Sequence, residues 1–399
     1  MPEISERGMQ MPESPIRKLS PLAEKAKHDG VKVYHLNIGQ PDLPSPQTAL
    51  DAIRNIDRTT LEYSPSDGYR FYRENLVKYY NRFNINISAD DIIVTAGGSE
   101  AVLYAFMACL NPGDEIIVHE PAYANYMAFA ISAGAIIRTI PSDMKSGFAL
   151  PPIEKFEEII NERTKGILIC NPNNPTGYVY SPEEMEKIRL LVKKHNLYLF
   201  SDEVYREFIY NDMPYISACN LKDVEDNVVL IDSVSKRYSE CGIRIGALIT
   251  RNKMVHDTVM KFCQARLSPP LIGQIAANAS LDAGTAYMQH NYNEYRKRRD
   301  YLIERLNNIP GVQSPMPEGA FYTLASLPVE DADDFCEWCL KNFRYKDCTI
   351  FMAPASGFYV TPGLGKQEVR IAYVTNIDDL DMAMTILEEA LKVYPHRTN

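Results

Sequence analysis

The chain lacks the features that mark membrane-spanning and nucleic-acid-binding proteins. Its 399 residues contain no apolar run long enough to cross a bilayer, and its first residues form no hydrophobic signal region. A formal net charge of -10 argues against an extended basic surface for nucleic acid or anionic lipid. We therefore expect no nucleic-acid partner, no membrane partner and a cytoplasmic location.

The cysteines do not form a recognisable metal or redox motif. The eight cysteines are scattered among apolar residues, which is typical of buried free thiols. Cys336 and Cys339 make one C-x-x-C pair, but neither a second pair nor a nearby histidine completes a zinc site. Residues 333–343 have the pattern of an amphipathic helix. We expect helix packing at this pair and no metal site in the protein.

Apolar runs alternate with helical patterns through the first two thirds of the chain. The runs typical of buried strands are 92–95, 115–119, 166–170, 197–201 and 228–231. Helical patterns fall at 100–110, 122–133 and 182–195, the last opened by a capping box from Ser181 to Glu184. This alternation predicts an α/β fold with a mainly parallel sheet. Residues 243–250 follow too closely for a helical crossover and predict an antiparallel strand.

The pattern changes near residue 284, where a long charged helix at 286–307 leads into shorter elements. We expect a large domain over 44–284 and a smaller α+β domain over 285–399. The N-terminal arm, residues 1–43, is expected to supply part of the small domain.

Polar residues follow the predicted strands. Gly97, Gly98 and Ser99 join a strand to a helix, where backbone N–H groups and the helix N-terminus favour an anion. Asn174 lies in the rigid turn Asn171-Pro172-Asn173-Asn174-Pro175-Thr176-Gly177, and Asp202 ends an apolar strand, where a carboxylate needs a partner. Read alone, the first turn could be an ordinary connection and Asp202 a helix cap. Because strand carboxyl ends are where α/β proteins bind ligands, the set together predicts one site.

Lys236 is the most informative residue. The segment Ser233-Val234-Ser235-Lys236, followed by Gly242-Ile243-Arg244-Ile245-Gly246, resembles the S-x-S-K…G-x-R-x-G signature of the aspartate-aminotransferase family (fold type I, class I/II aminotransferases). The resemblance covers roughly residues 33–373. It implies a seven-stranded large-domain sheet and the cofactor pyridoxal 5'-phosphate, held as a Schiff base by Lys236.

The same resemblance assigns roles to the strand-end residues. It places the cofactor phosphate on Gly97, Gly98, Ser99, Ser233 and Arg244. It implies that Asp202 holds the pyridine nitrogen protonated and that Asn174 and Tyr205 contact the phenolic oxygen, while Tyr123 stacks on the ring. Lys236, Asp202 and Tyr205 are thus the expected catalytic residues.

Arg370 is the expected substrate ligand. It lies in the apolar strand Val369-Arg370-Ile371-Ala372-Tyr373, and a buried arginine needs a carboxylate partner, internal or bound. The resemblance makes that partner the substrate α-carboxylate, with Gly39 and Asn174 beside it. Tyr63 resembles the tyrosine that reaches the phosphate of the neighbouring subunit, which implies a homodimer with shared active sites.

The resulting hypothesis is an aminotransferase that moves an amino group from an L-amino acid, aspartate-like by weak preference, to a 2-oxo acid such as 2-oxoglutarate. Two alternatives remain at this stage: a carbon–sulfur lyase or cyclopropane-carboxylate-type synthase on the same fold, and a non-catalytic cofactor-binding sensor. The chain departs from many relatives at Glu240-Cys241. Arg266 has no assigned role and is one candidate for reading a second substrate carboxylate.

Overall fold

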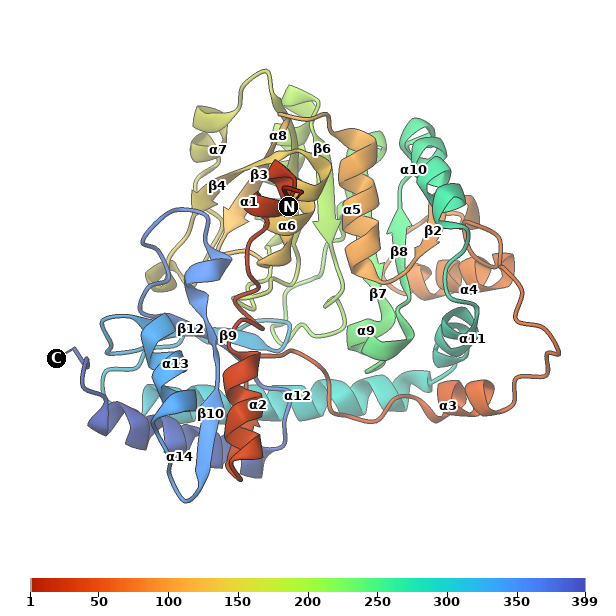
Figure 1. The fold of residues 1–399 in the computed structure, drawn as a ribbon. Helices are drawn as coiled ribbons and strands as arrows, with labels where there is room; N and C mark the ends of the chain where they lie inside the picture. The colour runs from red at the N-terminus through yellow and green to blue at the C-terminus, as the bar shows by residue number, and fades with distance from the viewer. Residues whose placement is uncertain (1, 399) are drawn as a thin grey trace.

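The computed structural model describes residues 2–398 and is built around a seven-stranded sheet (Figure 1). In spatial order the strands run β2-β8-β7-β6-β5-β3-β4. Their bounds are β2 Ile92–Thr95, β3 Glu115–Glu120, β4 Ile136–Pro141, β5 Thr164–Cys170, β6 Tyr198–Asp202, β7 Val228–Ser233 and β8 Gly246–Ile249. The five predicted strands and the number seven are confirmed.

Strand directions bring the expected site residues to one edge. β4, β3, β5, β6 and β7 are mutually parallel, whereas β8 is antiparallel to both β7 and β2. The predicted antiparallel strand is therefore confirmed, and β2 runs in the same direction as β7. Since parallel strands end at the same edge, Thr95, Glu120, Cys170, Asp202 and Ser233 all lie there.

Helices cover both faces because successive strand residues point to opposite sides. Ile116 and Val118 pack on one face with α5 and α6, and Ile117 packs on the other with α8. The large-domain helices are α4 Arg70–Asn81, α5 Gly98–Cys109, α6 Asn125–Ala133, α7 Ile153–Ile159, α8 Pro182–His195, α10 Lys253–Arg266 and α11 Leu271–Ser280. The predicted capping box of α8 is confirmed, with Ser181 accepting from the Glu184 N–H and Glu184 accepting from the Ser181 N–H.

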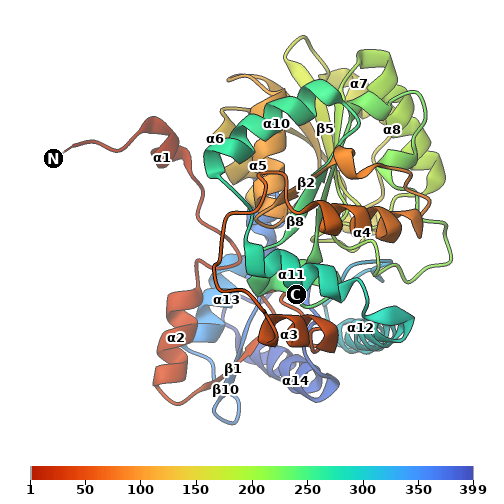
Figure 2. The same ribbon diagram turned by 90° about the vertical axis from the view of Figure 1, so that its right-hand side faces the viewer.

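A second group of elements joins the two ends of the chain (Figures 1 and 2). β1 Lys32–His35 pairs in parallel with β10 Cys348–Phe351, and β11 Ala353–Pro354, β12 Glu368–Ala372 and β9 Tyr322–Ser326 form an antiparallel sheet. The accompanying helices are α2 Ser20–His28, α12 Gly284–Asn307, α13 Ala332–Lys341 and α14 Ile377–Val393. Shorter α-helices in the described part of the chain include α1 Glu6–Gln10, α3 Gln47–Arg54 and α9 Val234–Arg237. The proposed domain boundaries at 43 and 284 stay predictions.

The C-x-x-C pair lies in α13, where Cys336 and Cys339 are buried free thiols, as predicted. Within residues 2–398 no group of three or more histidine, cysteine or acidic side chains is positioned to hold a metal ion. Over the same range, no helix is both long enough and apolar enough to cross a membrane.

Candidate active site

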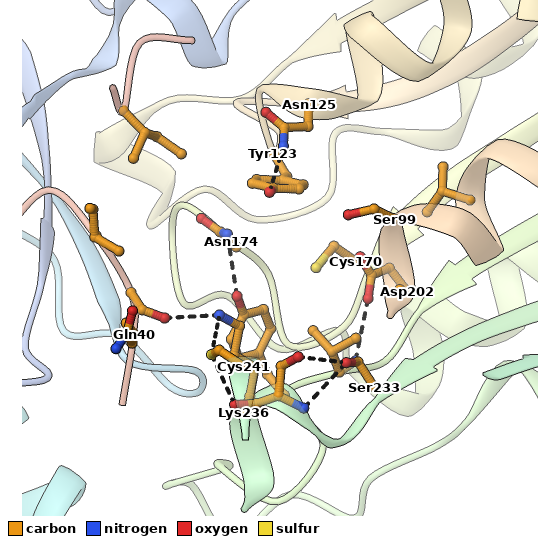
Figure 3. Close-up of a pocket in the computed structure, with 18 of the residues that line it drawn as sticks. Gln40, Ser99, Tyr123, Asn125, Cys170, Asn174, Asp202, Ser233, Lys236 and Cys241 are labelled. Carbon is orange, nitrogen blue, oxygen red and sulfur yellow. Dashed lines mark hydrogen bonds between the residues drawn. The ribbon is translucent and has the colours of Figure 1, made fainter. Parts of the chain in front are cut away.

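The strand ends open into a cavity of about 640 Å³ between the large sheet and the elements from the two chain ends. Figure 3 shows Lys236, Cys241, Asn174, Asp202, Tyr123 and Ser99 around it. Eleven of the predicted site residues line the cavity: Gly39, Gly98, Ser99, Tyr123, Asn174, Asp202, Tyr205, Ser233, Lys236, Arg244 and Arg370. Residues up to 331 positions apart in the sequence, from Gly39 to Arg370, thus share one site.

Lys236 reaches the cavity from the short helix α9, which begins directly after β7. Ser233 caps this helix by accepting a hydrogen bond from the Ser235 N–H at 3.2 Å. The Lys236 Nζ donates to the Gly39 carbonyl oxygen at 2.8 Å and lies 3.9 Å from the Cys241 Sγ. The lysine amine is therefore held at the centre of the site by the N-terminal loop.

Asp202 is the acidic group of the site and is only 8% exposed. Burial raises the pKa of its carboxyl to about 6, although the Tyr126 hydroxyl, donating at 2.7 Å, favours the charged form. The Val204 N–H also donates to it, at 3.3 Å, but no helix begins there, so the alternative of a helix cap is wrong. A buried carboxylate of this kind is well suited to pair with a cationic ligand atom.

Asn174 connects residues of both parts of the molecule. Its amide nitrogen donates to the Tyr205 hydroxyl at 3.4 Å, and its amide oxygen accepts from Arg370 at 3.2 Å. The neighbouring Asn173 instead accepts from the Thr176 N–H and hydroxyl and so stabilises the turn. Asn174 therefore lines the cavity, whereas Asn173 does not.

The opposite end of the cavity has the character of an anion site. The N-terminus of α5 opens at Gly98 and Ser99, and Ser233 and Arg244 face the same space. Gly97 does not line the cavity but has φ of 81°, and a Cβ there would lie 2.4 Å from Arg244 Nη2. Glycine at this position thus lets the arginine approach the helix N-terminus.

Arg370 is 1% exposed and has no carboxylate within ion-pair distance anywhere in residues 2–398. It donates to Asn174 and to the Asn37 carbonyl oxygen, while its Nε is buried without a hydrogen-bond partner. Burial consequently lowers its pKa from the usual value. Of the two partners that sequence reasoning left open, the internal carboxylate is excluded over the described range, and a ligand carboxylate fits the site.

Gly39 and Tyr322 are in unusually close contact. A Cβ added at Gly39 would lie 1.7 Å from the Tyr322 hydroxyl oxygen, so only glycine fits there. The same hydroxyl is 3.0 Å from the hydroxyl of Tyr205. The N-terminal loop, Tyr322 and Tyr205 are therefore in mutual contact at the cavity.

The remaining sequence-level candidates lie outside the cavity. Tyr63 is 75% exposed and does not line it, so its expected role toward a neighbouring subunit stays a prediction. Arg266 pairs with Glu100 at 3.1 Å and donates to the Ser66 carbonyl oxygen at 3.0 Å, so its charge already has a partner outside the cavity. The chain differs from many relatives at residues 240 and 241. Glu240 is buried against Ser280 of α11, whereas Cys241 lines the cavity.

Two kinds of cavity residue were not predicted from the sequence. Tyr126 supports Asp202, but an aromatic residue in the first turn of an apolar helix carries no functional signal. Ser14, Ile16 and Arg17 belong to the N-terminal arm, and no local pattern indicates that this polar segment crosses the cavity.

Comparison with known proteins agrees with this geometry. Residues 31–387 match the family model described as aminotransferase class I and II. The chain belongs to this family and is an aminotransferase.

Individual relatives extend over nearly the whole chain. The aspartate aminotransferase of Thermotoga maritima is 34% identical over 386 residues, covering 95% of this chain and 97% of that protein. The crystal structure of the Thermotoga maritima aspartate aminotransferase gives a TM-score of 0.89 at 32% identity, covering 98% of this chain and 100% of that chain. An alanine aminotransferase structure from Pyrococcus furiosus gives 0.89 at 30% identity, with the same coverage. The fold-type prediction is confirmed, and so is the choice of aminotransferase over the lyase, synthase and sensor alternatives.

Proposed function

We propose that this aminotransferase binds pyridoxal 5'-phosphate on Lys236 and takes an acidic amino acid, foremost aspartate, as amino donor. The acceptor would be a 2-oxo acid such as 2-oxoglutarate. The observation that carries the proposal is the meeting of Lys236, Asp202 and Arg370 in one cavity. These supply an amine, a buried carboxylate and a buried guanidinium without an internal acidic partner in residues 2–398.

The residues present fit the cofactor group by group. Its phosphate suits the α5 N-terminus with Ser99, Ser233 and Arg244, because backbone N–H groups and a guanidinium favour a dianion. Asp202, whose pKa burial raises to about 6, would be stabilised in its charged form beside a protonated pyridine nitrogen. The Asn174 amide and the Tyr205 hydroxyl are the polar groups suited to the phenolic oxygen.

When bound, the cofactor supplies an electron sink for the pair released as the substrate α-proton leaves. The chain would do the rest. Lys236, once free, would act first as a base that takes the substrate α-proton. It would then act as an acid that returns this proton at a different carbon. Asp202 would keep the sink charged, and Tyr123 would cover one face of the ring. Arg370 would bind the substrate carboxylate and so position the substrate for proton transfer by Lys236.

The acidic substrate is supported by the names of the relatives. The Thermotoga maritima protein, and others at 31% and 28% identity from Pyrococcus horikoshii and Sulfurisphaera tokodaii, are called aspartate aminotransferases. A Thermus thermophilus relative is called an aspartate/prephenate aminotransferase. All of these names share a dicarboxylic substrate.

We further propose a homodimer in which Tyr63 reaches the phosphate of the neighbouring active site. The 75% exposure of Tyr63 and the 63% exposure of the nearby Leu61 support a contact outside this chain. Sedimentation at micromolar concentration tests the assembly: a monomer would contradict it. The cytoplasmic location stays a prediction.

A half-reaction tests the proposed function directly. Purified enzyme loaded with the cofactor and given aspartate, without an acceptor, should release one equivalent of oxaloacetate per active site and then stop. Adding 2-oxoglutarate should produce glutamate and restart turnover. Continuous oxo-acid and ammonia release without an acceptor would contradict the proposal. Release from alanine or an aromatic amino acid, but not from aspartate, would contradict its substrate part.

A further inference from the structure

The charged groups of the cavity do not balance one another. Its lining holds four cationic side chains, Arg17, Lys236, Arg244 and Arg370, and one carboxylate, Asp202. None of the four cations has a carboxylate within ion-pair distance in residues 2–398. A cavity with this excess positive charge favours ligands with several negative charges.

Three of the four cations have a partner if the proposed function is right, and the inference rests on that assignment. Lys236 would be joined to the cofactor, Arg244 would face its phosphate, and Arg370 would bind the substrate α-carboxylate. Arg17 is left over. A substrate with a second carboxylate would supply the missing charge.

The N-terminal arm holds Arg17 in place over the cavity. The Ser14 carbonyl oxygen accepts from the backbone N–H groups of Arg17 and Lys18 at 3.0 and 2.8 Å, which closes a turn. The next side chain, Lys18, is ion-paired with Asp333 near the start of α13. The arm is thus fixed on both sides of Arg17, which is exposed and makes no hydrogen bond of its own through its side chain within the described range.

Asn37 ties Arg17 and Arg370 to the same part of the site. Its side-chain amide donates to the Ile16 carbonyl oxygen at 2.8 Å, directly before Arg17 in the chain. Its own carbonyl oxygen accepts from the Arg370 guanidinium. Both arginine charges also act on Tyr123, where they oppose the burial that raises the pKa of its hydroxyl to about 12. Arg370 is buried in the cavity, whereas Arg17 is exposed to solvent at its edge.

Two other cations of this chain already have carboxylate partners. Arg266, the sequence-level candidate, is paired with Glu100 and does not line the cavity. Lys18 is paired with Asp333. Among residues 2–398, Arg17 is therefore the one cavity cation that neither the cofactor nor the α-carboxylate would use.

We propose that Arg17 binds the second carboxylate of dicarboxylic substrates and so determines the preference for acidic over neutral amino acids. Because Arg17 is exposed to solvent, its attraction for a carboxylate is screened by water and salt. The preference should therefore be moderate, and it should weaken as ionic strength rises.

Calorimetric binding to the cofactor-loaded enzyme tests the assignment without relying on turnover. The probes are succinate, with two carboxylates, and butanoate, a four-carbon acid with one. In wild-type protein succinate should bind more tightly. Arg17→Ala should weaken succinate binding by up to about fivefold, as expected for one solvent-exposed ion pair, and leave butanoate within about twofold. Arg17→Lys should retain part of the preference, since it keeps the charge but loses the planar fork.

Lys25→Ala is the matched control, because Lys25 is an exposed cation in α2 that does not line the cavity. It removes the same charge and should leave both affinities unchanged. If wild-type protein prefers succinate and Arg17→Ala keeps that preference, the assignment to Arg17 is wrong while the proposed function stands. If wild-type protein binds succinate no better than butanoate, the acidic-substrate proposal is wrong and this inference is wrong with it.

Discussion

The Arg370 guanidinium donates a hydrogen bond to the Asn174 amide oxygen at 3.2 Å, joining a strand of the C-terminal sheet to a turn of the large sheet. This contact links the group proposed for the substrate carboxylate to the group proposed for the cofactor. It also leaves the guanidinium without a carboxylate partner in the described part of the chain. Substrate binding would therefore complete the charge pairing of a preformed site.

Replacing Arg370 by alanine should weaken aspartate and alanine as substrates to a similar degree, because both present the same α-carboxylate. The loss in kcat/KM should correspond to about 2–5 kcal/mol, as for removal of one partner of a buried charge pair. Steady-state kinetics with both substrates measures this.

Arg370→Lys serves as the control, since it keeps the charge and loses the two-pronged contact. Thermal unfolding should accompany the kinetics because Arg370 also packs on the rings of Tyr322 and Phe358. Loss of aspartate turnover with alanine turnover untouched would mean that Arg370 binds the side chain instead.

Asp202→Asn should retain cofactor binding and lose most activity. The phosphate-side residues remain, but the ring nitrogen loses its anionic partner, and removal of one dominant electrostatic interaction typically costs about 10²–10³ in rate. Single-turnover oxaloacetate release measures the rate, and bound phosphate content measures retention. Near-normal turnover in the variant would show that Asp202 has only a structural role.

Glu207 should make the stability of the fold depend on pH. Burial raises the pKa of this carboxyl from 4.5 to about 8, with Arg237 opposing the effect. The folded state therefore holds a proton that the unfolded state releases above about pH 4.5. The resulting stabilisation is complete below that pH and is lost as pH rises toward 8.

Glu207→Gln should remove this dependence. Chemical unfolding at pH 5.5 and pH 8.5 should show wild-type protein losing on the order of a few kcal/mol more than the variant between the two pH values. Glu183→Gln is the control for net charge, because it removes one carboxylate from the first turn of α8. Equal losses in wild type and Glu207→Gln would contradict the assignment.

The sequence predicted the large sheet well because its strands are nearly continuous apolar runs. β2 and α8 match their predicted bounds, and the short link before β8 fixed its direction. β4 was missed because it lies at the edge of the sheet and is half exposed, with a burial pattern that mixes buried and exposed residues. The pairing of β1 with β10 joins the two ends of the chain, and no local pattern encodes such a contact.

The candidate site was predictable where a chemical requirement marks a residue type. Asp202 and Arg370 are charged groups in apolar strands, which means that each needs a partner of opposite charge. Lys236 was instead indicated by the resemblance of its segment to the family signature. Tyr126 and Arg17 carry no such mark. One is an aromatic in a helix and the other a cation in a polar arm, and only the folded chain brings them to the cavity.

The central claim is that Lys236 carries the cofactor, and one measurement tests it most directly. Borohydride reduction of the enzyme with pyridoxal 5'-phosphate, followed by proteolysis and mass spectrometry, should place the reduced adduct on the peptide that contains Lys236. Lys236→Ala should give no stoichiometric adduct while keeping its fold by circular dichroism. An adduct on another lysine of the wild-type protein, or an undiminished adduct in Lys236→Ala, would contradict the account.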